Sequence, residues 1–186
     1  MKPQSDKNIY INDIIEGCKR GDLSAQKTLY ETYAKQMTTL CMRYISNREQ
    51  AINIMHDSFI HIFTVIKSFE GKGSFDGWIK RIFVNQSLQF LRKKDLLRDS
   101  GDLEIAQTTV ANDTASALDT ISANEIMAEI AKLSHLNRTV FNLYALEGYS
   151  HKEIAKELNI NVATTRSIYL RTRNILQKRL TENGIR

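Results

Sequence analysis

The sequence lacks any feature that would place the chain in a membrane or export it. Its apolar residues never run on for the roughly 20 positions that a membrane-spanning helix requires. The opening residues MKPQSDKNIYIND also lack the apolar block of a secretory signal. We therefore expect a cytoplasmic protein without direct membrane insertion. The length of 186 residues and the hydrophobic content of 42% allow one ordinary domain or two small ones.

The residue patterns of catalytic and metal sites are missing as well. Cys18 and Cys41 form no CxxC pair, and each falls on the apolar side of a helical pattern, so we expect buried, reduced thiols. His56 and His61 lie about 140° apart around a helix and cannot share a metal ion. No Ser-His or Cys-His arrangement stands out. We therefore expect no catalytic residue, no metal, no cofactor and no small-molecule substrate, and hence no enzyme.

Runs of alternating β-branched residues are also absent, and helical periodicity dominates. The sequence therefore predicts an all-α protein. In the first half of the chain, apolar spacing indicates a short helix that ends at Gly21 and a second that Asp22 caps. Further helices are expected over residues 48–69 and 75–94. We expect these helices to form one bundle, a first domain of residues 1–98.

The distribution of charge divides the chain into three parts. Residues 1–98 carry 16 Lys or Arg against 10 Asp or Glu, residues 99–121 carry 0 against 5, and residues 122–186 carry 10 against 6. The middle part also has no aromatic residue, which is typical of a flexible linker. Two small helical domains are therefore expected on either side of a flexible acidic linker. Their basic charge favours a polyanionic partner.

The second domain, residues 122–186, ends in the pattern of a helix-turn-helix. Helical spacing resumes over residues 123–133 and 137–146. Ser150 followed by Glu153 is a capping box that starts a helix at His151. A short turn over residues 159–161 follows, and Asn161 is placed to cap the next helix. This spacing is the one that a helix-turn-helix requires.

The last helix of this motif has an apolar and a polar side. The polar side is positive and carries no acid. Residues near the start of such a helix reach base edges in the major groove, and later basic residues hold phosphates. We predict duplex DNA contacts at Ala163, Thr164, Arg166, Ser167 and Arg171. The alternative is a solvated basic face on a structural helix.

A second polar ridge lies on the predicted helix of residues 75–94. Its members recur at steps of four, four and three, beside aromatic residues: Arg81, Asn85, Gln89 and Arg92. Such a ridge suits single-stranded or melted nucleic acid, whose bases stack and whose phosphates need neutralising. An ordinary exposed face has the same composition.

Two segments carry a resemblance to a known family. FEGKGSFDGWIKRIFVNQSLQFLRKK resembles the "sF..WL..I..N...D..R" segment of the extracytoplasmic-function sigma factors, and LEGYSHKEIAKELNINVATTRSIYLRTRNIL resembles their carboxy-terminal DNA-binding segment. The resemblance covers about residues 10–94 and 123–181, in matching order. It implies a first domain that binds core RNA polymerase and captures a flipped base of the minus-ten element, and a second that reads the minus-thirty-five element as duplex. It also implies a possible anti-sigma factor as partner, because many relatives are held inactive by one.

The resemblance also gives a role to the glycine loop between Phe69 and Phe75. Extruding a base costs a few kcal/mol, and a flexible loop of this kind can close around it. A nucleotide-binding loop is excluded by spacing, because Ile66 and Gly73 stand where a glycine and a Ser or Thr are required. The expected contacts to the melted strand are Lys72, Ser74, Phe75, Arg81, Asn85, Gln89 and Arg92.

The predicted helix of residues 48–69 carries the surface expected to bind polymerase, opposite its buried stripe. The residues are Asn53, His56, Asp57 and Ile60. The family typically shows an Asp and a Gln where this chain has Asn53 and His56. We read the chain as a transcription initiation factor that recruits RNA polymerase to promoter DNA and assists promoter melting. The alternatives are a helix-turn-helix regulator whose first domain senses a ligand or dimerises, a nucleotide-binding enzyme and a protein-interaction adaptor.

Overall fold

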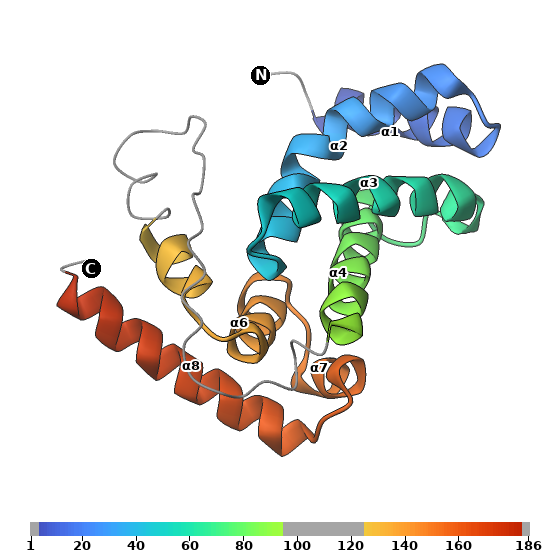
Figure 1. Ribbon diagram of the computed structural model, residues 1–186. Coiled ribbons are helices and arrows are strands. Elements are labelled where there is room, and N and C mark those ends of the chain that lie inside the picture. Colours follow the sequence, from blue (N-terminus) through green and yellow to red (C-terminus); the bar gives the residue numbers. More distant parts are fainter. Residues whose placement is uncertain (1–3, 95–124, 184–186) are drawn as a thin grey trace. The chain divides into compact units, whose positions relative to one another are not determined.

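The computed structural model describes residues 4–94 and 125–183 (Figure 1). Within these ranges the regular elements are all helical and no strand occurs, which confirms the predicted all-α fold. The chain divides into two compact units, Met1–Phe90 and Leu91–Arg186. The predicted linker, residues 99–121, lies outside the described residues.

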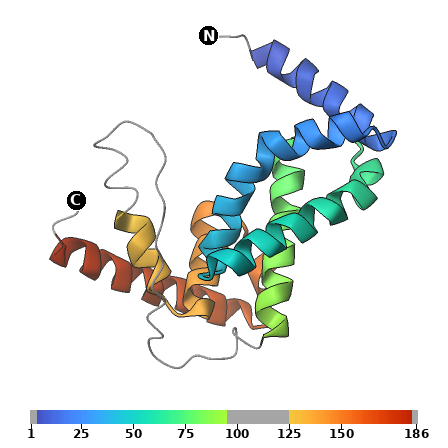
Figure 2. The same cartoon turned by 45° about the horizontal axis from the view of Figure 1, so that its top comes forward.

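The first unit is a bundle of helices joined by short connections. It contains α1 (Gln4–Lys19), α2 (Leu23–Tyr44), α3 (Arg48–Val65), the 3₁₀ turn η1 (Ile66–Ser68) and α4 (Phe75–Lys93), which crosses into the second unit at its last turn. Helix α2 packs against α1 along its first half and against α3 (Figures 1 and 2). The first helix is longer than predicted, because its polar first turns carry no apolar period that would reveal them.

Local capping and one close approach set the start and the packing of α2. The Asp22 carboxylate accepts a hydrogen bond from the Ser24 amide at 2.8 Å, as predicted for an N-cap. A Cβ atom at Gly17 of α1 would lie 2.6 Å from the Ala25 Cβ, so only glycine permits this crossing of α1 and α2. The residues of α2 that face the core recur at helical spacing: Leu29, Tyr33, Met37, Leu40, Cys41 and Tyr44.

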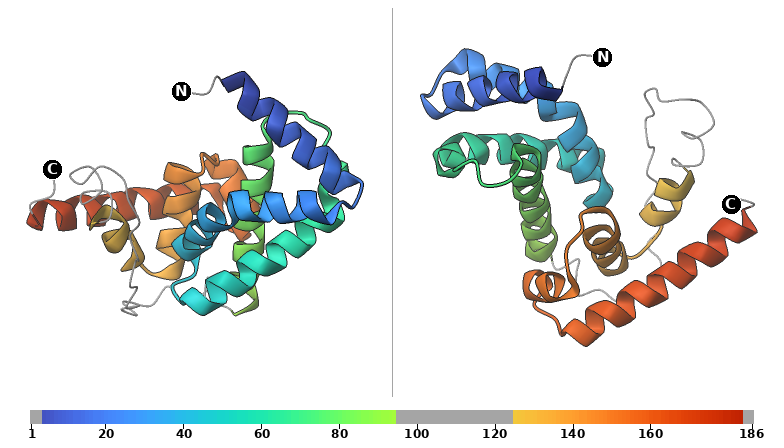
Figure 3. Two further views of the ribbon diagram at one scale, coloured as in Figure 1. Left: turned by 90° about the horizontal axis from the view of Figure 1, so that it is seen from above. Right: turned by 180° about the vertical axis from the view of Figure 1, so that it is seen from behind.

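The second unit holds the helix of residues 125–131, α6 (His135–Phe141), the π-helical turn η2 (Asn142–Leu146), α7 (His151–Leu158) and α8 (Val162–Glu182). Figure 3 shows α8 as a long helix that α7 and α6 meet along its first part. Where the sequence predicts one helix over residues 137–146, the structure has α6 followed by the wider π-helical turn η2. Ile130, Leu133 and Leu176 form a core that joins the helix of residues 125–131 to α8.

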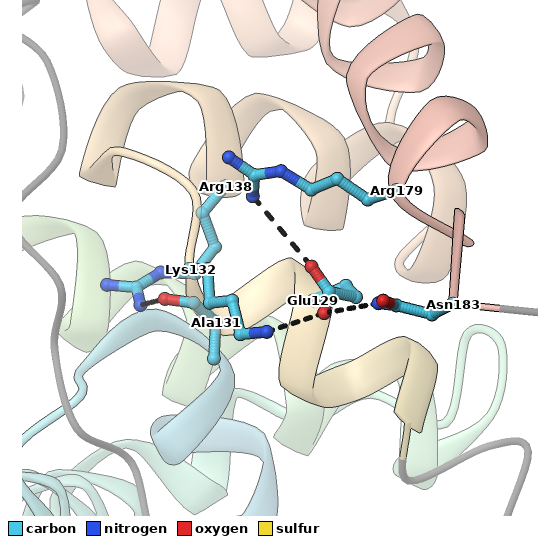
Figure 4. Close-up of polar contacts among 6 residues, drawn as sticks. All are labelled: Glu129, Ala131, Lys132, Arg138, Arg179 and Asn183. Atoms are coloured by element: carbon cyan, nitrogen blue, oxygen red, sulfur yellow. Dashed lines mark hydrogen bonds and ion pairs between the residues drawn. The ribbon is translucent and has the colours of Figure 1, made fainter. Parts of the chain in front are cut away.

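A buried carboxylate fastens the end of α8 to the helix of residues 125–131 (Figure 4). Glu129 is only 5% exposed. It receives Lys132 Nζ at 2.5 Å and Asn183 Nδ2 at 3.1 Å, and Arg179 Nη1 lies 4.0 Å away. Because a buried polar group is stable only when it is paired, these contacts compensate the burial of the Glu129 carboxyl group and fix the end of α8.

A buried guanidinium connects α6 to the same helix (Figure 4). Arg138 is buried, and its Nη1 donates to the Ala131 carbonyl at 3.1 Å. Burial lowers the pKa of Arg138 to about 10. Its Nη2 also lies 2.9 Å from His135 Nδ1, and the Ala131 contact holds α6 against the helix of residues 125–131.

Reactive side chains are few among residues 4–94 and 125–183. Cys18 and Cys41 are buried free thiols, as predicted, and burial raises the pKa of Cys41 to about 12. No three His, Cys, Asp or Glu side chains in these ranges gather where they could hold a metal ion. In the same part of the chain, no helix has the length and apolar character to cross a membrane.

Candidate nucleic-acid interfaces

The helix-turn-helix is built by three local caps. Ser150 Oγ accepts from the Glu153 amide at 3.3 Å while the Glu153 carboxylate accepts from the Ser150 amide at 2.9 Å, so the predicted capping box is present. Asn159 ends α7 in the left-handed region with φ 52°. Asn161 Oδ1 then accepts from the Ala163 amide at 2.8 Å and begins α8. The turn between the two helices is therefore fixed residue by residue.

Helix α8 separates its two faces as the sequence predicts. Its buried residues are Thr165, Thr172 and Leu176. The residues predicted to contact duplex DNA are all exposed: Ala163, Thr164, Arg166, Ser167 and Arg171. The stretch from 162 to 181 holds five Lys or Arg and no acidic residue. The exposed face is thus positive, and its side chains near the start of α8 are mostly small. This suits a close approach of the helix to base edges.

An aromatic stack behind this face was not predicted. The rings of Tyr144 and His151 are 4.2 Å apart and nearly parallel, at 14°, and Tyr169 of α8 lies 4.4 Å from Tyr144. Thr165 Oγ1 lies 3.3 Å from His151 Nδ1. Burial, and then the charge of Arg166, lowers the pKa of His151. The ring stack and the Thr165 contact place the start of α7 against α8.

The glycine loop of the first unit connects η1 to α4 and extends away from the core. Gly71 and Gly73 have φ values of 74° and 87°, and a Cβ at either position would meet nothing within 4 Å. Lys72 is exposed, and its Nζ pairs with Glu70 at 2.6 Å. Ser74 Oγ accepts from the Gly77 amide at 3.1 Å, which starts α4. Lys72 and Ser74 therefore both lie at the surface, as expected for a contact loop.

Three aromatic residues anchor the two ends of this loop. Phe69 and Phe75 meet edge to face at 5.2 Å, and Trp78 contacts both, at 5.3 Å and 5.5 Å. Phe75, which the sequence predicts as a strand contact, is only 7% exposed. Its ring packs against those of Phe69 and Trp78, at the point where the loop meets α4.

The polar ridge of α4 lies at the surface for most of its length. Arg81, Gln89 and Arg92 are exposed, whereas Asn85 is half-buried. The Asn85 carboxamide oxygen is enclosed and accepts no hydrogen bond from the described residues. An enclosed acceptor without a donor is energetically costly.

The predicted polymerase-binding residues share the exposed face of α3. Asn53, His56, Asp57 and Ile60 are all exposed, and Ile60 is 64% accessible. His56 is held from α2, because its Nε2 lies 3.1 Å from the Tyr30 hydroxyl. The face therefore combines an apolar centre with polar neighbours, a composition common at protein interfaces.

Comparisons with known proteins agree with both halves of this description. Residues 29–96 match the Sigma-70 region 2 model, and residues 123–176 match the model of Sigma-70, region 4. The ECF RNA polymerase sigma factor SigW of Bacillus subtilis is 30% identical over 181 residues, which cover 89% of this chain and 94% of that protein. The ECF RNA polymerase sigma-E factor of Haemophilus influenzae is 26% identical, with 90% and 93% covered.

Two solved structures share the fold. The sigma factor RpoE of Bartonella quintana, in complex with the anti-sigma factor NepR, has a TM-score of 0.57 at 20% identity and covers 83% of this chain and 96% of its own. CnrH in complex with the cytosolic domain of CnrY has a TM-score of 0.50 at 18% identity, with 91% and 96% covered. The chain therefore belongs to the extracytoplasmic-function family of RNA polymerase sigma factors, and is a transcription initiation factor that directs RNA polymerase to promoters.

Proposed function

We propose that the chain binds promoter DNA at two places: one domain binds duplex DNA and the other binds the melted strand. Domain 1–98 binds core polymerase and the minus-ten element, domain 122–186 binds the minus-thirty-five element, and residues 99–121 link them. The observation that carries this division is the acid-free, exposed face of α8 directly after a capped turn. That arrangement favours a helix placed in a major groove.

In the second domain, the first turns of α8 read base edges. Ala163 and Ser167 are small and exposed, so the helix can approach the base pairs closely. Arg166 extends from the same turns and has the geometry for a bidentate contact to guanine. Arg171, farther along α8, neutralises a phosphate. Thr164 takes a polar contact beside Arg166.

In the first domain, the loop and the ridge of α4 bind the melted strand. Lys72 and Ser74 are exposed on a loop that two positive-φ glycines shape. Asn85, half-buried on the same ridge, contacts the extruded base through its carboxamide. The exposed ridge residues neutralise phosphates or hydrogen-bond the strand: Arg81, Gln89 and Arg92. Phe75 contributes by anchoring the loop.

The exposed face of α3 binds core polymerase through Asn53, His56, Asp57 and Ile60. The chain itself catalyses no reaction, because RNA synthesis belongs to the polymerase, and it works in the cytoplasm. An anti-sigma factor is a further partner of this fold, since both similar structures are complexes, one of them with a named anti-sigma factor. Such a partner would compete with polymerase for exposed helical faces.

Reconstituted transcription tests the proposal. The protein, added to core polymerase and genomic DNA, is expected to give transcripts with defined start sites, and core polymerase alone is not. Asn85→Ala is expected to impair promoter opening, measured by permanganate reactivity of thymines, more than it impairs binding to minus-thirty-five duplex. Equal losses in the two assays would contradict the division of labour between the domains.

A further inference from the structure

A buried tyrosine of α2 is hydrogen-bonded to the first turn of α4, where the glycine loop ends. The Tyr33 hydroxyl donates to Asp76 Oδ1 at 2.5 Å. The ring of Tyr33 lies edge-on to Phe75, with centroids 5.9 Å apart at 69°. Tyr33 is 7% exposed. Burial first, and then the bond to Asp76, raises the pKa of Tyr33, so the hydroxyl remains a donor at every pH at which the protein works.

The loop has little packing of its own, and its geometry is therefore set at its two ends. It comprises the six residues between Ser68 and Phe75. Neither Gly71 nor Gly73 has a neighbour within 4 Å of its Cβ position. Whatever fixes the first turn of α4 also fixes where Ser74 leaves that helix, because the Ser74 hydroxyl is bonded to the Gly77 amide.

The contacts at the two ends differ in kind. Phe69 is held by rings and by Lys19, whose Nζ lies 6.0 Å from the ring centroid. Aromatic contacts of this type tolerate small shifts and rotations, because several offset geometries have similar energy. The bond from Tyr33 to Asp76 is directional, since a hydrogen bond to a carboxylate weakens steeply when its geometry changes. It fixes the rotation of the first turn of α4.

We propose that Tyr33 is a positioning residue for strand capture. Through Asp76 it holds the start of α4 so that the glycine loop is already shaped for an extruded base, and it touches no DNA itself. The inference rests on the proposed function of the loop. Preorganisation matters here because a loop that must be ordered on binding loses affinity for each residue that it immobilises.

The test replaces Tyr33 by phenylalanine, which keeps the ring and removes the donor. Holoenzyme is assembled with core polymerase on promoter DNA that carries 2-aminopurine at the minus-ten position, whose fluorescence reports base extrusion. Tyr33→Phe is expected to lower the extent of extrusion by up to about tenfold, the upper end of the net contribution of a typical hydrogen bond. Core binding and minus-thirty-five duplex binding are expected to stay unchanged.

Tyr44→Phe is the matched control, because it is the same change at a buried tyrosine of the same helix, about 16 Å farther along its axis. It is expected to leave base extrusion unchanged. Asp76→Asn keeps an oxygen acceptor and is expected to retain most of the extrusion, whereas Asp76→Ala is expected to lose as much as Tyr33→Phe. The double variant Tyr33→Phe with Asp76→Ala is expected to be no worse than either single variant.

Three outcomes would overturn the inference. If the Tyr33→Phe variant extruded the base to the wild-type extent, the hydrogen bond from Tyr33 to Asp76 would not shape the loop. Additive losses in the double variant would show that the two residues act separately. A parallel loss of core binding would indicate general damage to the bundle. If the wild-type protein itself forms no open complex with core polymerase, the proposed function fails, and that result is distinct from all three.

Discussion

Arg166 is the residue whose side chain distinguishes base reading from general attraction to DNA. It is exposed in the second turn of α8, five positions after the Asn161 cap. Replacing it by alanine is expected to weaken binding to the minus-thirty-five duplex by about 1–3 kcal/mol, the value of a bidentate contact to guanine. Fluorescence anisotropy with a labelled duplex measures this loss. Lys27→Ala, which removes an exposed charge from α2, is the control and should bind as wild type.

A second duplex with a scrambled sequence makes this test specific. If Arg166 reads a base, Arg166→Ala should hardly change binding to the scrambled duplex, because that contact is absent from it. Equal losses on both duplexes would reassign Arg166 to a phosphate contact and leave base reading to Thr164 and Ser167.

At the scale of elements, the crossing of α1 and α2 depends on one glycine. Alanine at Gly17 is expected to destabilise the first unit, because its Cβ would lie 2.6 Å from the Ala25 Cβ. The overpacking cost of about 1–3 kcal/mol outweighs the gain of up to about 1 kcal/mol from better helix propensity. Urea unfolding measures the change. Asp13→Ala, at an exposed position of the same helix, is expected to stay within about 0.5 kcal/mol of wild type.

In the second unit, the buried carboxylate of Glu129 is expected to contribute to stability through its polar contacts. Glu129→Gln keeps the shape but removes the charge that Lys132 and Asn183 address. Loss of a charged hydrogen-bonded group in a buried site is expected to cost about 1–3 kcal/mol. Hydrogen exchange should then become faster in the helix of residues 125–131 and at the end of α8.

Glu182→Gln provides the comparison for this variant. Glu182 makes an exposed pair with Lys178 at 3.9 Å, and exposed pairs contribute little. We expect hydrogen exchange in the second unit to be unchanged in Glu182→Gln. If the two variants behaved alike, the burial of Glu129 would not be what makes its contacts stabilising.

The range of each interaction explains what could be predicted from the sequence. The caps at Asp22, Ser150 and Asn161 join atoms two or three positions apart, so helix starts and the helix-turn-helix were readable from spacing. The buried and exposed faces of α2 and α8 follow from the helical spacing of their apolar residues, which is also a local pattern. By contrast, Tyr33 and Asp76 are 43 positions apart, and Glu129 and Asn183 are 54 apart. No local period encodes such pairs.

Contacts from distant segments also decide the surroundings of Phe75, and the end of α3 differs from its predicted position. A helical wheel shows that Phe75 begins α4, but not that Phe69, Trp78 and Tyr33 enclose its ring. The residues expected to extend the third helix to Phe69 instead form the 3₁₀ turn η1, because a helix end often tightens in its last turn. Burial from distant segments decides such details.

At the scale of the whole molecule, the distribution of charge predicts a salt-dependent DNA affinity. The net charge is +5, and 26 of the residues are Lys or Arg. Each phosphate that the protein neutralises releases counterions, so the logarithm of the binding constant should fall linearly with the logarithm of salt concentration. Anisotropy titrations over a range of salt concentrations, with the minus-thirty-five duplex, give the slope.

Arg171→Ala connects that slope to a single contact. If Arg171 neutralises one phosphate, its removal should make the slope less steep by about one and should weaken specific and scrambled duplexes alike. Lys27→Ala, at the same net charge, should leave the slope unchanged, because α2 does not face the duplex in the proposed division of labour. A slope that falls equally in both variants would mean that overall charge governs the affinity, and the exposed face of α8 would then not be the site of duplex binding.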